Sequence, residues 1–144
     1  MSQDKIRKKF NEPLSAKRIV VKIGSALLTH KTEAINKSIV ERLASEIALL
    51  SKNGIEVILV SSGAIASGRI ALNISGRVHD VSLKQVLAAV GQGLLLQMYE
   101  QIFHSHGIRI AQALLTRHDM EERLGYLNVR NTLLKLIELD VIPI

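Results

Sequence analysis

The stretch "VILVSSGAIASGRI", from Val57 to Ile70, carries the strongest indication of the fold of this chain. Its apolar start, rich in β-branched residues, predicts a buried strand that two serines and Gly63 bring to an end. After four intervening residues come Gly68 and Arg69, so the stretch nearly matches the P-loop pattern G-x-x-x-x-G-K-[ST]. That pattern has a lysine where Arg69 stands and a magnesium-binding hydroxyl where Ile70 stands. The stretch is therefore either an altered P-loop or a different anion-binding turn.

The residues before this stretch predict a β–α–β unit. "RIVVKIGSALL" predicts a strand over about 18–23, and "NKSIVERLASEIALLSKNG" predicts a helix that begins after Asn36 and ends at Asn53–Gly54. The strand "IEVILVSS", residues 55–62, follows, and its apolar residues on both faces are typical of a parallel sheet that is covered on both sides. The crossover should be right-handed.

The residues after the stretch continue the alternation. A helix begins within "GAIASGRIAL", and Ser82 and Gln85 predict a capping box that opens a long second helix. Gly91 and Gly93 lie inside that helix and indicate a kink or a close backbone approach. The broad apolar face predicted for it holds Leu83, Val86, Leu87, Val90, Leu94, Met98 and Ile102.

The last third of the chain predicts two more strands and one more helix. "IRIAQALLT" predicts a third strand, residues 126–139 predict a helix, and "VIPI" predicts the start of a fourth strand. Strands that alternate with helices predict an α/β fold with an open sheet.

The composition excludes several classes of protein. The chain has 144 residues, the size of one domain, and no apolar run long enough to span a bilayer. It has no cysteine, which excludes disulfide scaffolds and cysteine-ligated zinc and is compatible with a cytoplasmic location. Residues 1–18 hold six Lys/Arg and two Asp/Glu, a net charge of +4 out of +6 for the chain. We predict that residues 1–17 are a basic, flexible leader that does not bind nucleic acid.

Two turns rich in small residues follow the first two predicted strands. They are "KIGSA" and "SSGAIASG", and ligands of open parallel sheets bind at such carboxyl ends of strands. Glycines expose backbone amides there, and the second turn leads into a helix N-terminus, which favours anions. Lys22 ends the first strand, where an ammonium group needs water or an anion. Lysine and free amides together suit phosphoryl transfer, so "SSGAIASG" is interpreted as an anion-binding turn beside Lys22, not as a P-loop.

Five segments in this order resemble the glutamate 5-kinases (γ-glutamyl kinases) of the amino acid kinase family. They are "VVKIGSALLT", "VSSGAIASGR", "KQVLAAVGQ", "LLTRHDMEER" and "LNVRNTL". "KIGS" alone is shared with the carbamate kinase-like, acetylglutamate kinase-like and uridylate kinase-like branches. "SSGAIASGR" followed by "KQVLAAVGQ" separates the glutamate 5-kinases from them.

The resemblance implies a three-layer αβα sandwich with a mostly parallel sheet, truncated here. It implies ATP-dependent phosphorylation of the side-chain carboxylate of L-glutamate to γ-glutamyl phosphate, the first step of proline biosynthesis, often with feedback inhibition by proline. It makes Lys22 the catalytic lysine that binds the ATP phosphates. The other site residues that it implies are Gly24 and Ser25 at the phosphates, Ser62, Gly63 and Ala64 at glutamate, and Asp119 near the substrate and feedback site.

The chemistry that this resemblance implies needs no general base and no protein metal site. A glutamate side chain has a pKa of about 4.3 and is ionised at neutral pH, so it needs only alignment with the γ-phosphate and charge neutralisation. Mg²⁺ would be held mainly by the phosphates of ATP and by water. His104 and His106, two residues apart near a helix end, are interpreted as ordinary helix-end histidines.

The resemblance covers only the N-terminal, amino-acid-substrate half of a kinase domain, residues 18–144. The nucleotide-binding half and any PUA domain would be absent, so the isolated chain is expected to be inactive. The apolar strand at its end predicts association, as in a homo-oligomer. Two alternatives stay open: a degenerate P-loop-like nucleotide-binding protein, and a non-enzymatic assembly module that keeps the fold.

Overall fold

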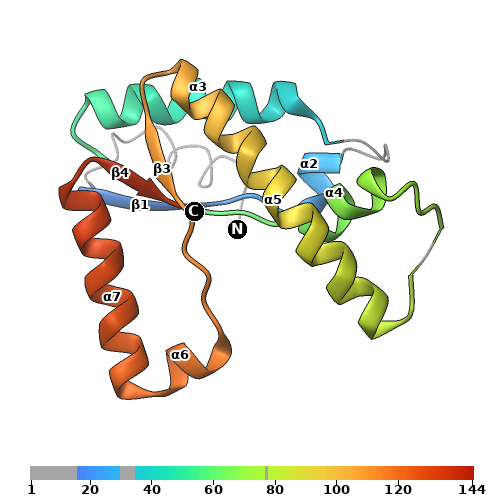
Figure 1. Cartoon of the computed structure of the whole chain (residues 1–144). Coiled ribbons are helices and arrows are strands. Elements are labelled where there is room, and N and C mark those ends of the chain that lie inside the picture. The colour runs from blue at the N-terminus through green and yellow to red at the C-terminus, as the bar shows by residue number, and fades with distance from the viewer. Residues whose placement is uncertain (1–15, 30–34, 77) are drawn as a thin grey trace, which may run out of the picture.

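The computed structural model describes residues 16–29, 35–76 and 78–144, in which strands and helices alternate (Figure 1). The strands are β1 (Arg18–Lys22), β2 (Glu56–Val60), β3 (Arg109–Ala111) and β4 (Val141–Pro143). The helices are α2 (Ser25–Thr29), α3 (Lys37–Lys52), α4 (Ala64–Ala71), α5 (Val81–Ser105), α6 (Arg117–Glu121) and α7 (Arg123–Glu138). The predicted α/β class is confirmed, whereas the predicted leader lies outside the described residues except for positions 16 and 17.

The strands form two parallel pairs. β1 pairs with β2 in a register that sets Lys22 opposite Val60, and β3 pairs with β4. β2 also contacts β4, which brings the two pairs together. α3 connects β1 to β2 and α7 connects β3 to β4, so each parallel pair is closed by a helical crossover, as parallel strands require.

Helices lie on both sides of the strands, as in an αβα sandwich. α3 packs against β2 and α5, and together they enclose the hydrophobic core. α7 packs against β4 and extends with α6 to the other side of β1 (Figure 1). The largest fully buried side chains are Tyr99, Phe103, Leu28, Ile47, Leu59, Leu87, Val40 and Pro143.

β1 is covered on only one face by the described residues. Ile19 and Val21 pack against the core, whereas Arg18, Val20 and Lys22 are exposed. The sequence predicted a strand buried within a sheet, and the alternating burial of β1 departs from that prediction. The exposed face is the one that carries Lys22.

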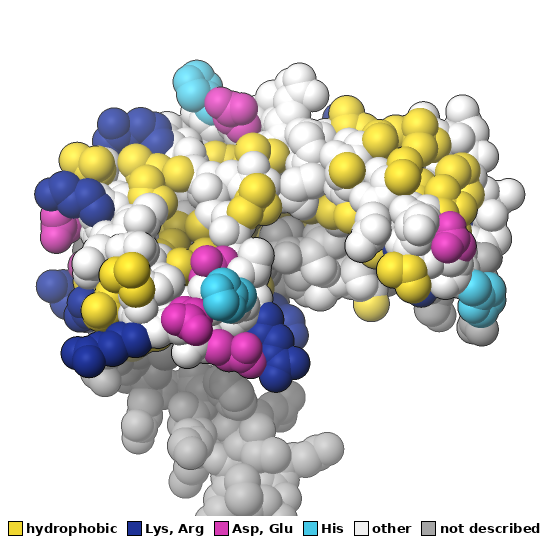
Figure 2. All heavy atoms as spheres, turned by 60° about the horizontal axis from the view of Figure 1, so that its bottom comes forward, with side chains coloured by type: hydrophobic (Ala, Val, Ile, Leu, Met, Phe, Trp, Pro, Cys, Tyr) yellow, Lys and Arg dark blue, Asp and Glu magenta, His cyan; other side chains and the backbone are white. Residues whose placement is uncertain are grey.

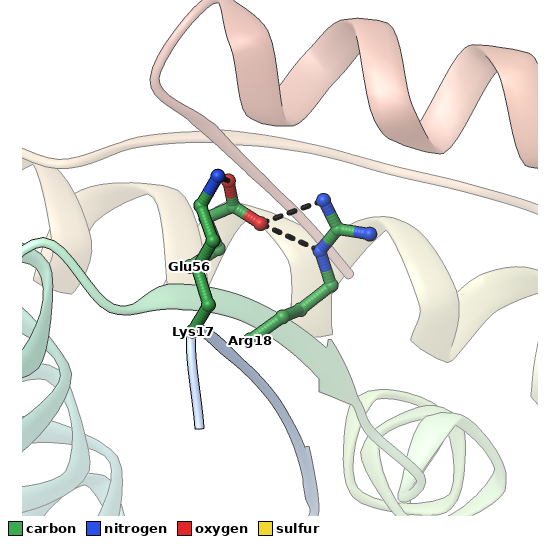
Figure 3. A network of polar contacts seen from close by, with 3 residues as sticks. All are labelled: Lys17, Arg18 and Glu56. Atoms are coloured by element: carbon green, nitrogen blue, oxygen red, sulfur yellow. Dashed lines mark hydrogen bonds and ion pairs between the residues drawn. The ribbon is translucent and has the colours of Figure 1, made fainter. Parts of the chain in front are cut away.

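An ion-pair network joins the starts of β1 and β2 (Figure 3). The Arg18 guanidinium donates from Nε to the Glu56 carboxylate at 2.7 Å, and its Nη2 lies 2.6 Å from the same oxygen, Oε2. Lys17 Nζ lies 3.9 Å from the other oxygen of Glu56. Because Lys17 and Arg18 are exposed and Glu56 is only partly buried, the network supports the strand register more than it adds stability.

The N-cap of α5 differs from the predicted one. Its N-cap is Asp80, whose carboxylate accepts hydrogen bonds from the backbone N–H groups of Ser82 (3.3 Å) and Leu83 (2.9 Å). The predicted capping box of Ser82 and Gln85 is therefore wrong. Ser82 and Gln85 both lie within the helix, which begins at Val81, and the carboxylate of Asp80 takes the capping role because it reaches two free amides at once.

Replacing Asp80 tests this assignment. Asp80→Ala should lower the free energy of unfolding by about 1 kcal/mol, the usual loss for an N-cap carboxylate. Ser82→Ala is the matched control, and it should leave stability within about 0.5 kcal/mol of the parent. Urea unfolding followed by circular dichroism measures both, and a larger loss for Ser82→Ala would restore the capping box.

The buried face of α5 also differs from the predicted one. Val86, Val90 and Leu94 are exposed by 50%, 38% and 45%. The residues of α5 that are buried are Leu87, Gly91, Leu95, Met98, Tyr99 and Phe103. Figure 2 shows hydrophobic side chains gathered over α4 and α5 on its right-hand side. The predicted stripe is right at Leu87 and Met98 and wrong at Val86, Val90 and Leu94, which lie where a close crossing with α4 sets the rotation of α5.

This crossing is made by two glycines. A Cβ atom on Gly91 would lie 1.8 Å from the carbonyl oxygen of Ala64, and one on Gly68 would lie 1.9 Å from the carbonyl oxygen of Leu87. Gly93 faces open space. The close backbone approach predicted for the long helix is thus confirmed at Gly91, and the backbone that it meets belongs to α4.

Candidate functional site

The structure brings the two predicted turns together at the carboxyl ends of β1 and β2. The Ile23 N–H donates to the Val60 carbonyl at 2.8 Å, which extends the parallel ladder by one bond. One step further, the Ser62 hydroxyl donates to the Ile23 carbonyl at 3.2 Å. The turn that holds Ser62 therefore lies against the turn that holds Lys22 and Gly24.

Lys22 is the cation at this edge. It lies at the last position of β1, its side chain is exposed, and no carboxylate of the described residues forms an ion pair with it. Its ammonium group is thus available to an anionic ligand, since lysine at the end of an otherwise apolar strand is stabilised by an anion or by water.

The first turn leads directly into a short helix. The Gly24 carbonyl accepts from the N–H groups of Leu27 (3.1 Å) and Leu28 (3.3 Å), which starts α2 at Ser25. Leu28 is fully buried and packs against the second turn: a Cβ atom added to Gly63 would lie 3.3 Å from the Cδ1 atom of Leu28. The two turns therefore share one apolar support.

The second turn depends on the left-handed conformation of Gly63. Its φ is 106°, which L-residues with side chains adopt at a cost, and it is the N-cap of α4. The Gly63 carbonyl accepts from the N–H (2.9 Å) and the hydroxyl (3.1 Å) of Ser67. No side chain caps the helix that begins at Ala64. The first amides of α4 consequently point toward the edge that carries Ser62, an arrangement that favours negative charge.

Arg69 lies at the wrong end of this helix for a P-loop. In that pattern the basic residue follows the loop directly at the start of a helix. Here α4 begins at Ala64, so Arg69 lies in the last turn, and its Nε donates to the Ile74 carbonyl at 3.2 Å. The structure therefore favours the anion-binding turn over the altered P-loop.

Asp119 is held by a helix cap away from these turns. The N–H and the hydroxyl of Thr116 donate to its carboxylate at 2.8 and 2.5 Å, and the Asp119 N–H donates back to the Thr116 hydroxyl at 3.2 Å. These hydrogen bonds, with the nearby His118, hold the pKa of Asp119 below its usual range. α6 packs against α7 and lies far from α2 and α4 (Figure 1). The structure does not bring Asp119 beside Lys22, and its role near the substrate stays a prediction.

A cavity of about 330 Å³ lies at the carboxyl ends of β2 and β4, next to the second turn. Its polar lining comes from Ser61, Gln92, Tyr99 and Gln112, and the rest of the lining is mostly apolar. Sequence reasoning placed Ser61 in the second turn without giving it a role, and it did not single out Gln92, Tyr99 or Gln112. Ser61 directly follows β2 and Gln112 directly follows β3, and these positions were the signal available, because residues that follow parallel strands gather at this edge.

The described residues offer no ready-made metal site. Among them, no group of three or more His, Asp or Glu side chains is placed to hold a metal ion. None of the helices in the described part of the chain is long and apolar enough to cross a membrane. The arrangement as a whole can bind an anion between an ammonium group, hydroxyls and free amides.

Comparisons with known proteins agree with this geometry. The sequence model of the family described as "Amino acid kinase family" matches residues 17–144. The glutamate 5-kinase of Dehalococcoides mccartyi is 51% identical over 128 residues, which cover 89% of this chain and 34% of that protein. The glutamate 5-kinase of Laribacter hongkongensis is 51% identical over 130 residues, and that of Burkholderia cenocepacia is 49% identical over 129 residues. Each of these alignments covers 90% of this chain and 35% of the relative. The chain thus spans about a third of the length of these curated relatives.

The family match runs through both turns and through every strand and helix that the structure describes. Parallel strands with helices on both sides are what the resemblance predicted, and the structure brings the turn after Lys22 into contact with the turn that holds Ser62. The chain belongs to the amino acid kinase family.

Proposed function

We propose that this chain forms the amino-acid-binding part of a glutamate 5-kinase. The reaction is transfer of the γ-phosphoryl group of ATP to the side-chain carboxylate of L-glutamate, the first step of proline biosynthesis. The observation that carries the proposal is the contact between the Lys22 turn and the Ser62 turn at one edge of the sheet. Identities of 45–51% with curated glutamate 5-kinases across both turns support it.

The side chains divide the work between the two substrates. Lys22 neutralises the ATP phosphates and the charge that spreads over the transferred group, while Gly24 and Ser25 shape the phosphate turn. Ser62, with Gly63 and Ala64, binds and orients glutamate. A carboxylate oxygen attacks the γ-phosphorus, the bond to the bridging oxygen breaks, and ADP leaves with that electron pair. The attacking carboxylate is already ionised, so no side chain has to remove a proton.

Magnesium enters this proposal only with the nucleotide. Mg²⁺ keeps several waters and is usually bound through the phosphates of a nucleotide, so it would be held mainly by the ATP phosphates and water. In the proposal Lys22 is then the protein cation that complements the metal-bound nucleotide.

The proposal extends to the domain organisation, location and regulation of the kinase. Residues 18–144 form the amino-acid-substrate half, residues 1–17 form a basic leader, and the nucleotide-binding half belongs to the part of the relatives that this chain does not span. We propose a cytoplasmic location, assembly as a homo-oligomer, and feedback by proline through the segment around Asp119, which forms α6. Neither a membrane nor a nucleic acid is a proposed partner.

Isothermal titration tests the proposal directly. The chain should bind L-glutamate measurably, and L-aspartate, one methylene shorter, more weakly by roughly tenfold or more. A coupled ADP-release assay should show no turnover by this chain alone. A chain that binds neither glutamate nor ATP would be a module that has kept only the fold, and turnover by the isolated chain would contradict its assignment as an incomplete kinase.

A further inference from the structure

The hydroxyl of Tyr99 is a buried polar group that the proposed reaction does not use. Tyr99 lies on α5 with 1% of its surface exposed, and its ring packs against Phe103 with 6.0 Å between the ring centroids. Its hydroxyl lies 2.8 Å from the hydroxyl of Ser61. Phenylalanine would fill the same apolar volume, so the hydroxyl needs an explanation of its own.

Ser61 is the residue through which this hydroxyl reaches the site. It directly follows β2 and directly precedes Ser62, and it lines the 330 Å³ cavity together with Tyr99. Ser61 is half-buried, and its hydroxyl is hydrogen-bonded to the Tyr99 hydroxyl on α5. Ser62 is exposed, and its hydroxyl donates to the Ile23 carbonyl. The turn is thus anchored on one side to α5 and on the other to the end of β1.

We propose that Tyr99 is a positioning residue: its hydroxyl, through Ser61, fixes the turn that presents Ser62 and Gly63 to the amino-acid ligand. The inference rests on the proposed function for the identity of that ligand. An exposed serine on an unanchored turn would have to be ordered when the ligand binds, and that ordering reduces affinity. A turn held in advance from α5 avoids this loss.

The chemistry of the pair suits a permanent anchor. Burial raises the pKa of the Tyr99 hydroxyl, and the hydrogen bond with Ser61 opposes that rise only in part. The phenol therefore stays neutral at physiological pH and serves as donor or acceptor to a neutral serine. Because no charge changes in this range, the anchor works independently of pH between about 5 and 8.

Conservative substitutions isolate the hydroxyl. Tyr99→Phe and Ser61→Ala each remove one side of the bond, and Ser61→Thr retains the hydroxyl. Tyr126→Phe is the matched control, since Tyr126 is 46% exposed and its hydroxyl has no hydrogen-bond partner among the described residues. Circular dichroism first establishes that all variants are folded.

The first readout is the mobility of the turn, measured as ¹⁵N order parameters for the amides of Ser62 and Gly63. They should fall from about 0.85 toward 0.6 in Tyr99→Phe and in Ser61→Ala, and stay near the parent value in Ser61→Thr and Tyr126→Phe. This readout needs no ligand. Unchanged order parameters in Tyr99→Phe would overturn the inference, whether or not glutamate binds.

The second readout is the dissociation constant for L-glutamate. It should rise roughly three- to tenfold in Tyr99→Phe and at least as much in Ser61→Ala, which also removes the hydrogen bond from the Ser61 hydroxyl to the Ser62 carbonyl (3.2 Å). The double variant should match Ser61→Ala, because Tyr99→Phe then has no further bond to Ser61 to remove. A mobile turn with unchanged glutamate affinity would overturn the positioning role. If the parent chain itself does not bind glutamate, the proposed function fails, and the order parameters alone decide whether Tyr99 holds the turn.

Discussion

Gly91→Ala should lower the free energy of unfolding by about 3 kcal/mol or more, the upper range for overpacking. Its new Cβ would lie 1.8 Å from the Ala64 carbonyl oxygen and 2.4 Å from the Gly68 nitrogen. Both are backbone atoms, so no side-chain rotation relieves the clash, and α4 and α5 must separate. Urea unfolding followed by circular dichroism measures the loss.

Gly93→Ala is the matched control, because it lies two residues further along the same helix. A Cβ there meets nothing within 4 Å. The substitution should therefore raise stability by about 0.5–1 kcal/mol through helix propensity alone. Equal effects of the two substitutions would mean that α4 and α5 do not cross at Gly91.

The crossing also matters for the site. α4 begins directly after Gly63, and Gly91 contacts its first residue, Ala64. A separation of α4 from α5 moves the amides at the start of α4 away from the edge of the sheet. We expect any folded fraction of Gly91→Ala to bind L-glutamate more weakly than the parent, whereas Gly93→Ala should bind it equally well.

Lys22→Ala should abolish most of the catalysis in a complete kinase that contains this chain. Loss of one group that stabilises transition-state charge lowers kcat by about 10²- to 10³-fold. Lys22 is exposed and unpaired among the described residues, so its removal should change the free energy of unfolding by less than about 0.5 kcal/mol. Coupled ADP release, with a parallel urea titration, separates the two effects.

Arg69→Ala is the control that distinguishes the two interpretations of the glycine-rich stretch. Arg69 lies in the last turn of α4 and bonds to the Ile74 carbonyl. Its loss should weaken that loop and leave kcat within a few-fold of the parent. A loss of activity larger for Arg69→Ala than for Lys22→Ala would contradict the assignment of Lys22 and support a P-loop.

Local chemistry made several parts of this structure predictable. The helix over 37–52 has an apolar period of 3.6 and ends at Asn53–Gly54, where Gly54 has a φ of 76°. The two turns were predicted from sequence because small residues directly after apolar strands are typical of ligand-binding turns at the carboxyl ends of a parallel sheet. The capping residue of α5 was missed, because aspartate, serine and glutamine in close succession offer more than one local solution, and the carboxylate reached both free amides.

By itself, the sequence determined the order of the four strands and the four longer helices, the parallel pairing and the two turns that place Lys22 and Ser62 at one edge; the short helices α2 and α6 were not predicted. These features follow from residue types a few positions apart. Only the tertiary structure decided which face of α5 is buried, where Asp119 lies, and that Tyr99 meets Ser61 from 38 residues away. The buried face of α5 depends on its rotation against α4, which the glycine crossing sets, and the position of Asp119 depends on how α6 packs against α7. Contacts between residues far apart in the chain decide these features, and no local period encodes them.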